Sequence, residues 1–160
     1  MANFPYNYPI NRTHNMILYI RGDAMSLDQV YEKIQNNNIE IFNFGLENIK
    51  SVSVEADGRY GIFINHKEIE DSNEEFIVAT HEYGHCMTGS THPPYSPLDI
   101  ISKHEYRADR KAVLDFLPLD KIKSAIKNGC RSAYEFSEYL DVPEQFVIKA
   151  FQHYTAMDLI

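Results

Sequence analysis

The sequence predicts an α+β fold, in which a small antiparallel sheet packs on a helix with an HExxH motif and is followed by a glutamate-bearing helix and carboxy-terminal helices. Apolar and polar residues alternate between residues 39 and 64, as they do in strands. Around the HExxH motif, and after residue 103, the apolar residues recur at helical spacing instead. A run of strands followed by a run of helices is typical of an α+β domain.

Length and charge limit the possible classes of protein. The 160 residues are expected to form one domain (1–160), with an amino-terminal arm (1–25), a core that holds the motif (26–117) and a helical carboxy-terminal part (118–160). The net charge of −8 argues against nucleic acid or an anionic membrane as a partner. Because the chain has neither a membrane-spanning apolar run nor a signal-like start, we expect it to be cytoplasmic.

One helix and three strands are expected between the arm and the motif. Ser26 to Gln29 has the pattern of a capping box, so a helix begins there and ends at Asn36–Asn38. Strands are predicted over 39–44, 52–54 and 60–64, with a hairpin turn at Asp57-Gly58.

The motif itself lies in a helix predicted over residues 73–88. Ser72 to Glu75 resembles a second capping box, and Gly89 is a natural stop. Prolines 93, 94 and 97 then predict a loop over residues 88–101, after which a new helix begins near Lys103.

The last third of the chain is expected to be helical. One helix is predicted over Asp120–Gly129, a second opens at Ser132 and a third opens at Asp141.

The motif points to metal chemistry. Residues four apart on a helix share a face, so His81 and His85 can bind one metal ion. Glu82 lies beside that face, where a carboxylate can take a proton from an attacking water, as in zinc hydrolases. We therefore expect one Zn²⁺ per chain as cofactor and Glu82 as the catalytic base.

A hydrolytic zinc site requires a third protein ligand. The metzincin spacing is excluded, because Thr91 stands where that class has histidine. A glutamate from a second helix is the other common arrangement, and Glu105 lies 20 residues after His85 (105 − 85). Asp109, one turn further on, can accept a hydrogen bond from the far nitrogen of a ligand histidine. His104 remains a competitor for the third ligand.

These residues resemble the ImmA/IrrE metallopeptidases of bacterial mobile elements and prophages, over about Leu27 to Tyr154. The resemblance rests on Gly61-Ile-Phe-Ile-Asn65, Ala79-Thr80 with His81 to His85, and Glu105-x-x-Ala108-Asp109-x-x-Ala112. Asp109 stands where that family usually has asparagine, and Lys111 where it usually has an aromatic residue. The resemblance implies a zincin-like fold and a zinc-dependent endopeptidase, often one that cleaves a helix-turn-helix repressor.

The expected partner is therefore a protein substrate, a transcriptional repressor of the same mobile element. If the strand that ends at Asn65 is a sheet edge, it can pair with an extended substrate through Tyr60, Ile62 and Ile64. The loop over Pro93–Pro97 would cover that substrate. Neither the oligomeric state nor a donor to the transition state is predicted, since Tyr60, Tyr83, Tyr95, His104 and Tyr106 all remain possible.

Two other functions stay open. The domain could sequester a partner as a toxin or antirepressor without cutting it. Residues 132–154 also resemble a helix-turn-helix, which would bind DNA. The second of these helices offers only Lys149 as a base, so a packing hairpin explains the segment better.

Overall fold

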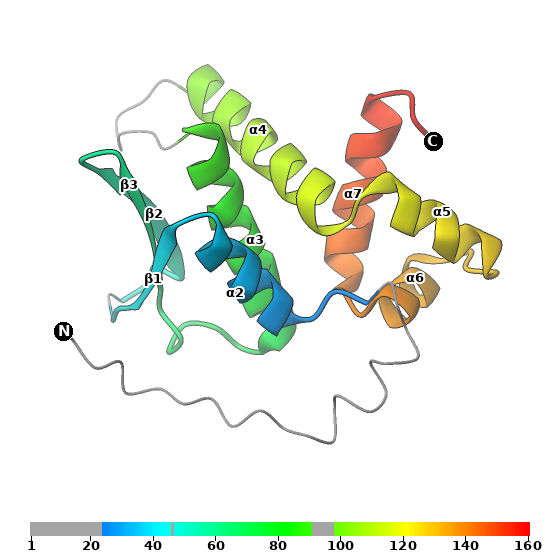
Figure 1. The fold of residues 1–160 in the computed structure, drawn as a ribbon, viewed down its shortest axis with the longest axis horizontal. Helices are drawn as coiled ribbons and strands as arrows, with labels where there is room; N and C mark the ends of the chain where they lie inside the picture. The colour runs from blue at the N-terminus through cyan, green and yellow to red at the C-terminus, as the bar shows by residue number, and fades with distance from the viewer. Residues whose placement is uncertain (1–23, 46, 91–97) are drawn as a thin grey trace.

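A computed structural model describes residues 24–45, 47–90 and 98–160 of the chain. In these residues the chain forms six helices and three strands, which confirms the α+β class (Figure 1). In chain order they are α2 (Leu27–Asn36), β1 (Ile39–Asn43), β2 (Ser51–Ala56), β3 (Arg59–Ile64), α3 (Ser72–Thr88), α4 (Leu98–Phe116), α5 (Leu119–Lys127), α6 (Ala133–Leu140) and α7 (Glu144–Ala156).

The sheet is mixed, so the prediction of an antiparallel sheet is wrong. The strand order is β1-β3-β2, with β3 parallel to β1 and antiparallel to β2. The reason is burial: β3 is the most apolar strand and takes the central position, where Ile62 and Ile64 are fully buried. The more polar β2 lies at an edge, and its Val52 and Val54 are exposed.

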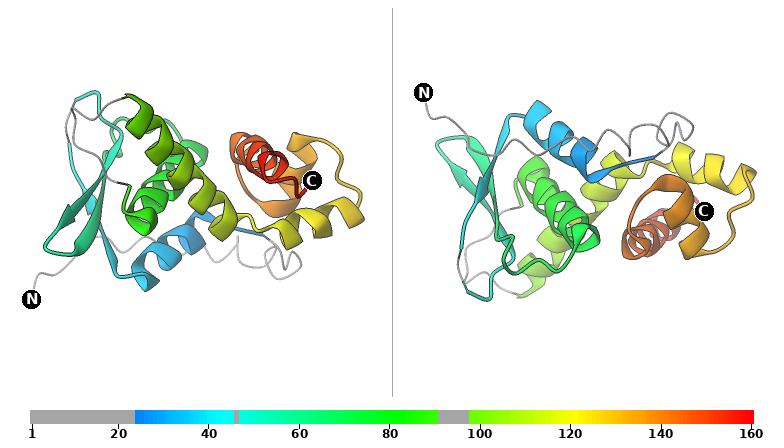
Figure 2. Two further views of the ribbon diagram at one scale, coloured as in Figure 1. Left: turned by 90° about the horizontal axis from the view of Figure 1, so that it is seen from above. Right: turned by 90° about the horizontal axis from the view of Figure 1, so that it is seen from below.

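The elements follow one another along the length of the molecule. Figures 1 and 2 show the sheet at one end, α5 to α7 at the other end, and α3 with α4 between them. Helix α3 packs on β2 and β3 on one side and on α2 and α4 on the others. The helix that carries the motif is thus the central element of the fold.

One continuous core joins the two halves of the molecule. The rings of Phe76 on α3 and Phe146 on α7 meet edge to face, with centroids 5.1 Å apart. The Tyr154 hydroxyl of α7 donates to the carbonyl of Leu117, at 2.9 Å. Buried side chains from α2 to α7 belong to a single cluster, so α5 to α7 share their core with the motif helix.

Several predicted helix boundaries require correction. Asp71, not Ser72, caps α3 by accepting a hydrogen bond from the Glu74 amide. Helix α4 is longer than predicted, because it begins at Leu98. Asp141 does not open α7 but adopts a left-handed conformation at the end of α6. The capping box at Ser26 is confirmed, as is that at Ser132.

Helices α3 and α4 cross in unusually close contact at Gly84. A Cβ atom at this position would lie 2.1 Å from the carbonyl oxygen of Ala108, where no real atom fits. Both residues are buried. A glycine inside a helix costs about 1 kcal/mol relative to alanine, so its presence here is explained by the close approach that it permits.

None of the helices in the described part of the chain has the length and apolar character that crossing a bilayer requires.

Candidate metal centre

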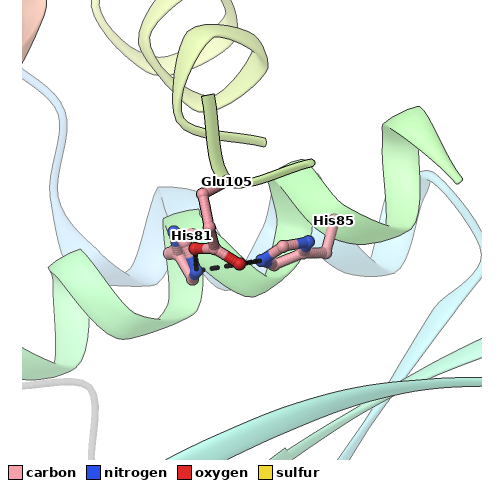
Figure 3. Close-up of side chains that lie close together, drawn as sticks. All are labelled: His81, His85 and Glu105. Carbon is pink, nitrogen blue, oxygen red and sulfur yellow. Dashed lines mark hydrogen bonds and ion pairs between the residues drawn. The ribbon is translucent and has the colours of Figure 1, made fainter. Parts of the chain in front are cut away.

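Two histidines and one glutamate bring their ligand atoms together at the crossing of α3 and α4 (Figure 3). The Nε2 atoms of His81 and His85 are 3.0 Å apart. The carboxylate of Glu105 lies 3.2 Å from Nε2 of His81 and 3.4 Å from Nε2 of His85. Among the described residues these three form a group that could hold a metal ion, as their spacing in the sequence predicts.

The far nitrogens of the two rings show why this group suits a cation. Nδ1 of His81 lies 2.9 Å from an oxygen of Asp109, and Nδ1 of His85 lies 3.2 Å from the carbonyl oxygen of Ser90. Since both partners only accept, each Nδ1 carries the hydrogen and each Nε2 presents a lone pair. Two lone pairs and a carboxylate therefore converge, an arrangement that a bound cation stabilises.

The surrounding charges act differently on the two rings. Burial alone would lower the pKa of His81, but the hydrogen bond to Asp109 and the charges of Asp109, Glu82 and Glu105 raise it above its ordinary value. Burial lowers the pKa of His85, and the neighbouring His81 lowers it further. His81 thus binds a proton more readily than His85, and a metal ion would compete with that proton.

Glu82 lies beside the three ligand side chains and is held from the sheet. Its side chain is buried, and the Ser51 hydroxyl of β2 donates to Oε1 at 2.7 Å. This contact of Ser51 with Glu82 was not predicted from the sequence. The serines of β2 alternate with exposed valines and so face α3, but this alternation alone does not relate Ser51 to the motif.

Asp109 has the supporting position that its spacing predicts. It accepts from His81 and also from Lys149 of α7, whose Nζ is 2.7 Å from the same oxygen. Burial disfavours the charged carboxylate, but these two hydrogen bonds outweigh it and lower the pKa of Asp109 to about 2. The sequence did not predict this contact between Lys149 and Asp109.

Two neighbours of the ligands lie outside the ligand group. His104 is adjacent to Glu105 in sequence, but the converging set contains Glu105 instead. Cys86 is buried, and burial together with the charge of Glu82 raises its pKa to about 12, so its thiol stays protonated. Cys86 therefore packs as a small buried apolar residue.

The strand predicted to bind substrate lies in the centre of the sheet. β3 is paired on both sides, so it is not a sheet edge. Ile62 and Ile64 face the core with no exposed surface, and the Tyr60 hydroxyl donates to Glu55, at 3.1 Å. These residues cannot pair with a substrate as predicted. Among the described residues the two edges of the sheet are β1 and β2.

The possible transition-state donors are reduced in number. The hydroxyl of Tyr83 is engaged with Asp115 at 2.7 Å, and this ring packs on Phe116 in the core. Tyr106 is exposed and its ring lies 4.9 Å from that of His153. Tyr95 and the predicted loop at Pro93–Pro97 lie outside the described residues.

Comparison with known proteins does not assign the chain to a family. No protein family, no curated protein and no solved structure matches it significantly. The geometry defines a three-residue group able to hold a metal ion, and it does not select among metals.

Proposed function

We propose that this protein is a zinc-dependent endopeptidase with a zincin-like fold, of the ImmA/IrrE type that its motifs resemble. The observation that carries the proposal is the convergence of His81, His85 and Glu105 beside the buried carboxylate of Glu82. Two imidazoles and one carboxylate are a ligand set of hydrolytic zinc sites, in which one position stays open. The Ser51 hydroxyl holds the Glu82 carboxylate in place, so this carboxylate is positioned for proton transfer.

Each residue has a defined part in peptide hydrolysis. A zinc ion held by the three ligands would polarise the peptide carbonyl and acidify the attacking water. Glu82 accepts the proton of that water on its carboxylate and delivers it to the leaving amine nitrogen. Ser51 keeps the carboxylate in place from β2, while Asp109 and the Ser90 carbonyl fix the two ring orientations.

The free edge of β2 gives this proposal a route for substrate binding. Ser51, at the start of β2, contacts Glu82, so this strand runs beside the candidate site. An extended peptide could add to its edge through main-chain hydrogen bonds and present one bond to the metal. We infer that the substrate is a flexible segment of a small repressor, as the family resemblance implies.

The contacts of Lys149 argue against the DNA-binding alternative. It is the one lysine of α7, which has no arginine, and it is paired with Asp109. Phe146, Val147 and Ala150 of the same helix are buried in the core. Helix α7 is thus used for packing, and it offers no free lysine or arginine to phosphate groups.

The decisive experiment compares the wild type with Glu82→Gln. We expect both proteins to bind one zinc ion, because Glu82 is not a ligand, and only the wild type to cleave the repressor. General bases contribute roughly 10²- to 10⁴-fold, and the loss of rate should lie in that range.

Fragment masses after incubation with zinc or a chelator provide the readout. A discrete, chelator-sensitive fragment pair supports the peptidase. If the repressor binds but stays intact with the zinc-loaded wild type, the protein acts by sequestration and the proposal is wrong.

A further inference from the structure

The candidate metal centre extends to the carboxy-terminal helix through Lys149. Nζ of Lys149 donates to Oδ1 of Asp109 at 2.7 Å, and Nδ1 of His81 donates to the same oxygen at 2.9 Å. A single carboxylate oxygen therefore joins α7 to the first histidine of the motif. The donors come from two different helices, and the acceptor comes from a third.

We propose that Lys149 is a positioning residue for the metal centre: it fixes the Asp109 carboxylate so that His81 keeps its hydrogen on Nδ1 and presents Nε2 to the metal. This inference rests on the proposed metal site. An aspartate side chain has two rotatable bonds, and one hydrogen bond leaves it free to turn away. Two charge-assisted or strongly polar donors from separate helices hold it in one orientation.

The surroundings of Lys149 favour this role over that of an ordinary surface ion pair. Its side chain is 30% exposed and that of Asp109 is 22% exposed, so water competes only in part for the carboxylate. One turn along α7, the buried His153 packs its ring on Tyr106 of α4. This contact holds α7 against α4, so the ammonium group of Lys149 stays within reach of Asp109.

A second lysine provides a matched comparison. Lys111 of α4 is 33% exposed and pairs with Asp115 of the same helix at 3.0 Å, in a contact of similar burial. Asp115 accepts from Tyr83 and not from a histidine of the ligand group. Loss of the Lys111 ion pair should therefore leave the metal centre unchanged.

The direction in which metal affinity changes when Lys149 is removed distinguishes a positioning role from an effect of its charge alone. A nearby ammonium group repels a divalent cation, so if only its charge mattered, removal of Lys149 would tighten metal binding. Positioning predicts the opposite. The charges that raise the pKa of His81 are those of Asp109, Glu82 and Glu105, whereas Lys149 acts on Asp109.

The test measures zinc affinity of the full chain by competition with a chromophoric chelator. Replacement of a group that supports a metal ligand typically weakens binding by about 10- to 100-fold, and we expect this for Asp109→Ala, which removes the acceptor. Because Lys149 acts only through Asp109, Lys149→Met should weaken zinc binding less than that, by roughly 3- to 10-fold. Lys149→Arg, which keeps charge and donors, should restore most of the affinity, and Lys111→Met should match the wild type.

A double-mutant cycle shows whether Lys149 acts through Asp109. In the Asp109→Ala background, where no acceptor is left for Lys149 to hold, Lys149→Met should have little further effect on zinc affinity. An unchanged or tighter affinity of Lys149→Met overturns the inference, and so does an equal loss in both backgrounds, because the effect would then come from packing of α7.

These outcomes are distinct from failure of the proposed function. If the wild type binds no zinc, or if Glu105→Ala binds it as well as the wild type, the metal site itself is wrong. If the wild type and Glu105→Ala differ as expected while Lys149→Met equals the wild type, only the role of Lys149 is refuted.

Discussion

At the scale of single residues, the choice of the third ligand can be tested directly. Glu105 lies within 3.4 Å of both ligand histidines, whereas its neighbour His104 is not part of the converging group. Glu105→Ala should therefore lose bound zinc, because two histidines alone rarely hold it against a chelator. His104→Ala should retain one zinc ion per chain.

Metal content after dialysis, measured by mass spectrometry, checks both variants. Retention of zinc by Glu105→Ala together with its loss from His104→Ala would reverse the assignment.

The three residues of the candidate metal centre were predictable from the sequence, but the residues that contact them were only partly so. A helix has a fixed period, so the spacing of His81 and His85 determines that they share a face. Glu105 and Asp109 followed from a similar argument on the next helix. Ser51 and Lys149 come from distant elements, and no local period relates them to the motif. Only the tertiary fold brings them to the site.

At the scale of elements, the crossing of α3 and α4 depends on Gly84. A methyl group there would overlap the backbone of Ala108, which cannot move as a flexible side chain would. Gly84→Ala should push the helices apart, destabilise the protein by roughly 1–3 kcal/mol or more, and weaken zinc binding because Glu105 moves with α4.

Chemical denaturation and zinc titration of the same variant measure these two effects. Ala79→Gly is a useful control, since it alters the same helix at a buried site but creates no overlap. A Gly84→Ala protein with unchanged stability and zinc affinity would show that the close crossing is not required.

Local signals predicted the elements better than their arrangement. The end of α3 at Gly89 and the capping boxes at Ser26 and Ser132 are all confirmed, since each depends on neighbours within one turn. The order of the strands depends instead on which strand the core buries most. Alternation alone could not place β3 in the centre, and the parallel pair it forms with β1 was therefore missed.

At the scale of the whole molecule, Asp109 should make the folding stability depend on pH in the acidic range. Its pKa is lowered from 3.8 to about 2 in the folded protein, so the folded state binds this proton less readily than the unfolded chain. The stabilisation is complete above pH 3.8 and is lost as pH falls through about 2. At 1.36 kcal/mol per pH unit, it amounts to roughly 2 kcal/mol.

Urea unfolding of the metal-free protein between pH 5 and pH 2 measures this dependence. Asp109→Asn should be less stable at the upper end of the range and should lose less stability on acidification than the wild type. Parallel curves for the two proteins would mean that Asp109 is not held by His81 and Lys149 in solution.

The turn after α3 has a consequence for how the site would look in a genetic screen. Gly89 is left-handed, with φ of 58°, and this reversal of the chain places the carbonyl of Ser90 against His85. The group that orients His85 therefore belongs to the main chain, and truncation of side chains one by one would leave it intact. Gly89, which contacts no metal, would instead stand out as intolerant of replacement, because other residues resist its backbone conformation. A mutational scan of this chain would thus identify Gly89, which contributes a backbone conformation and no chemical group.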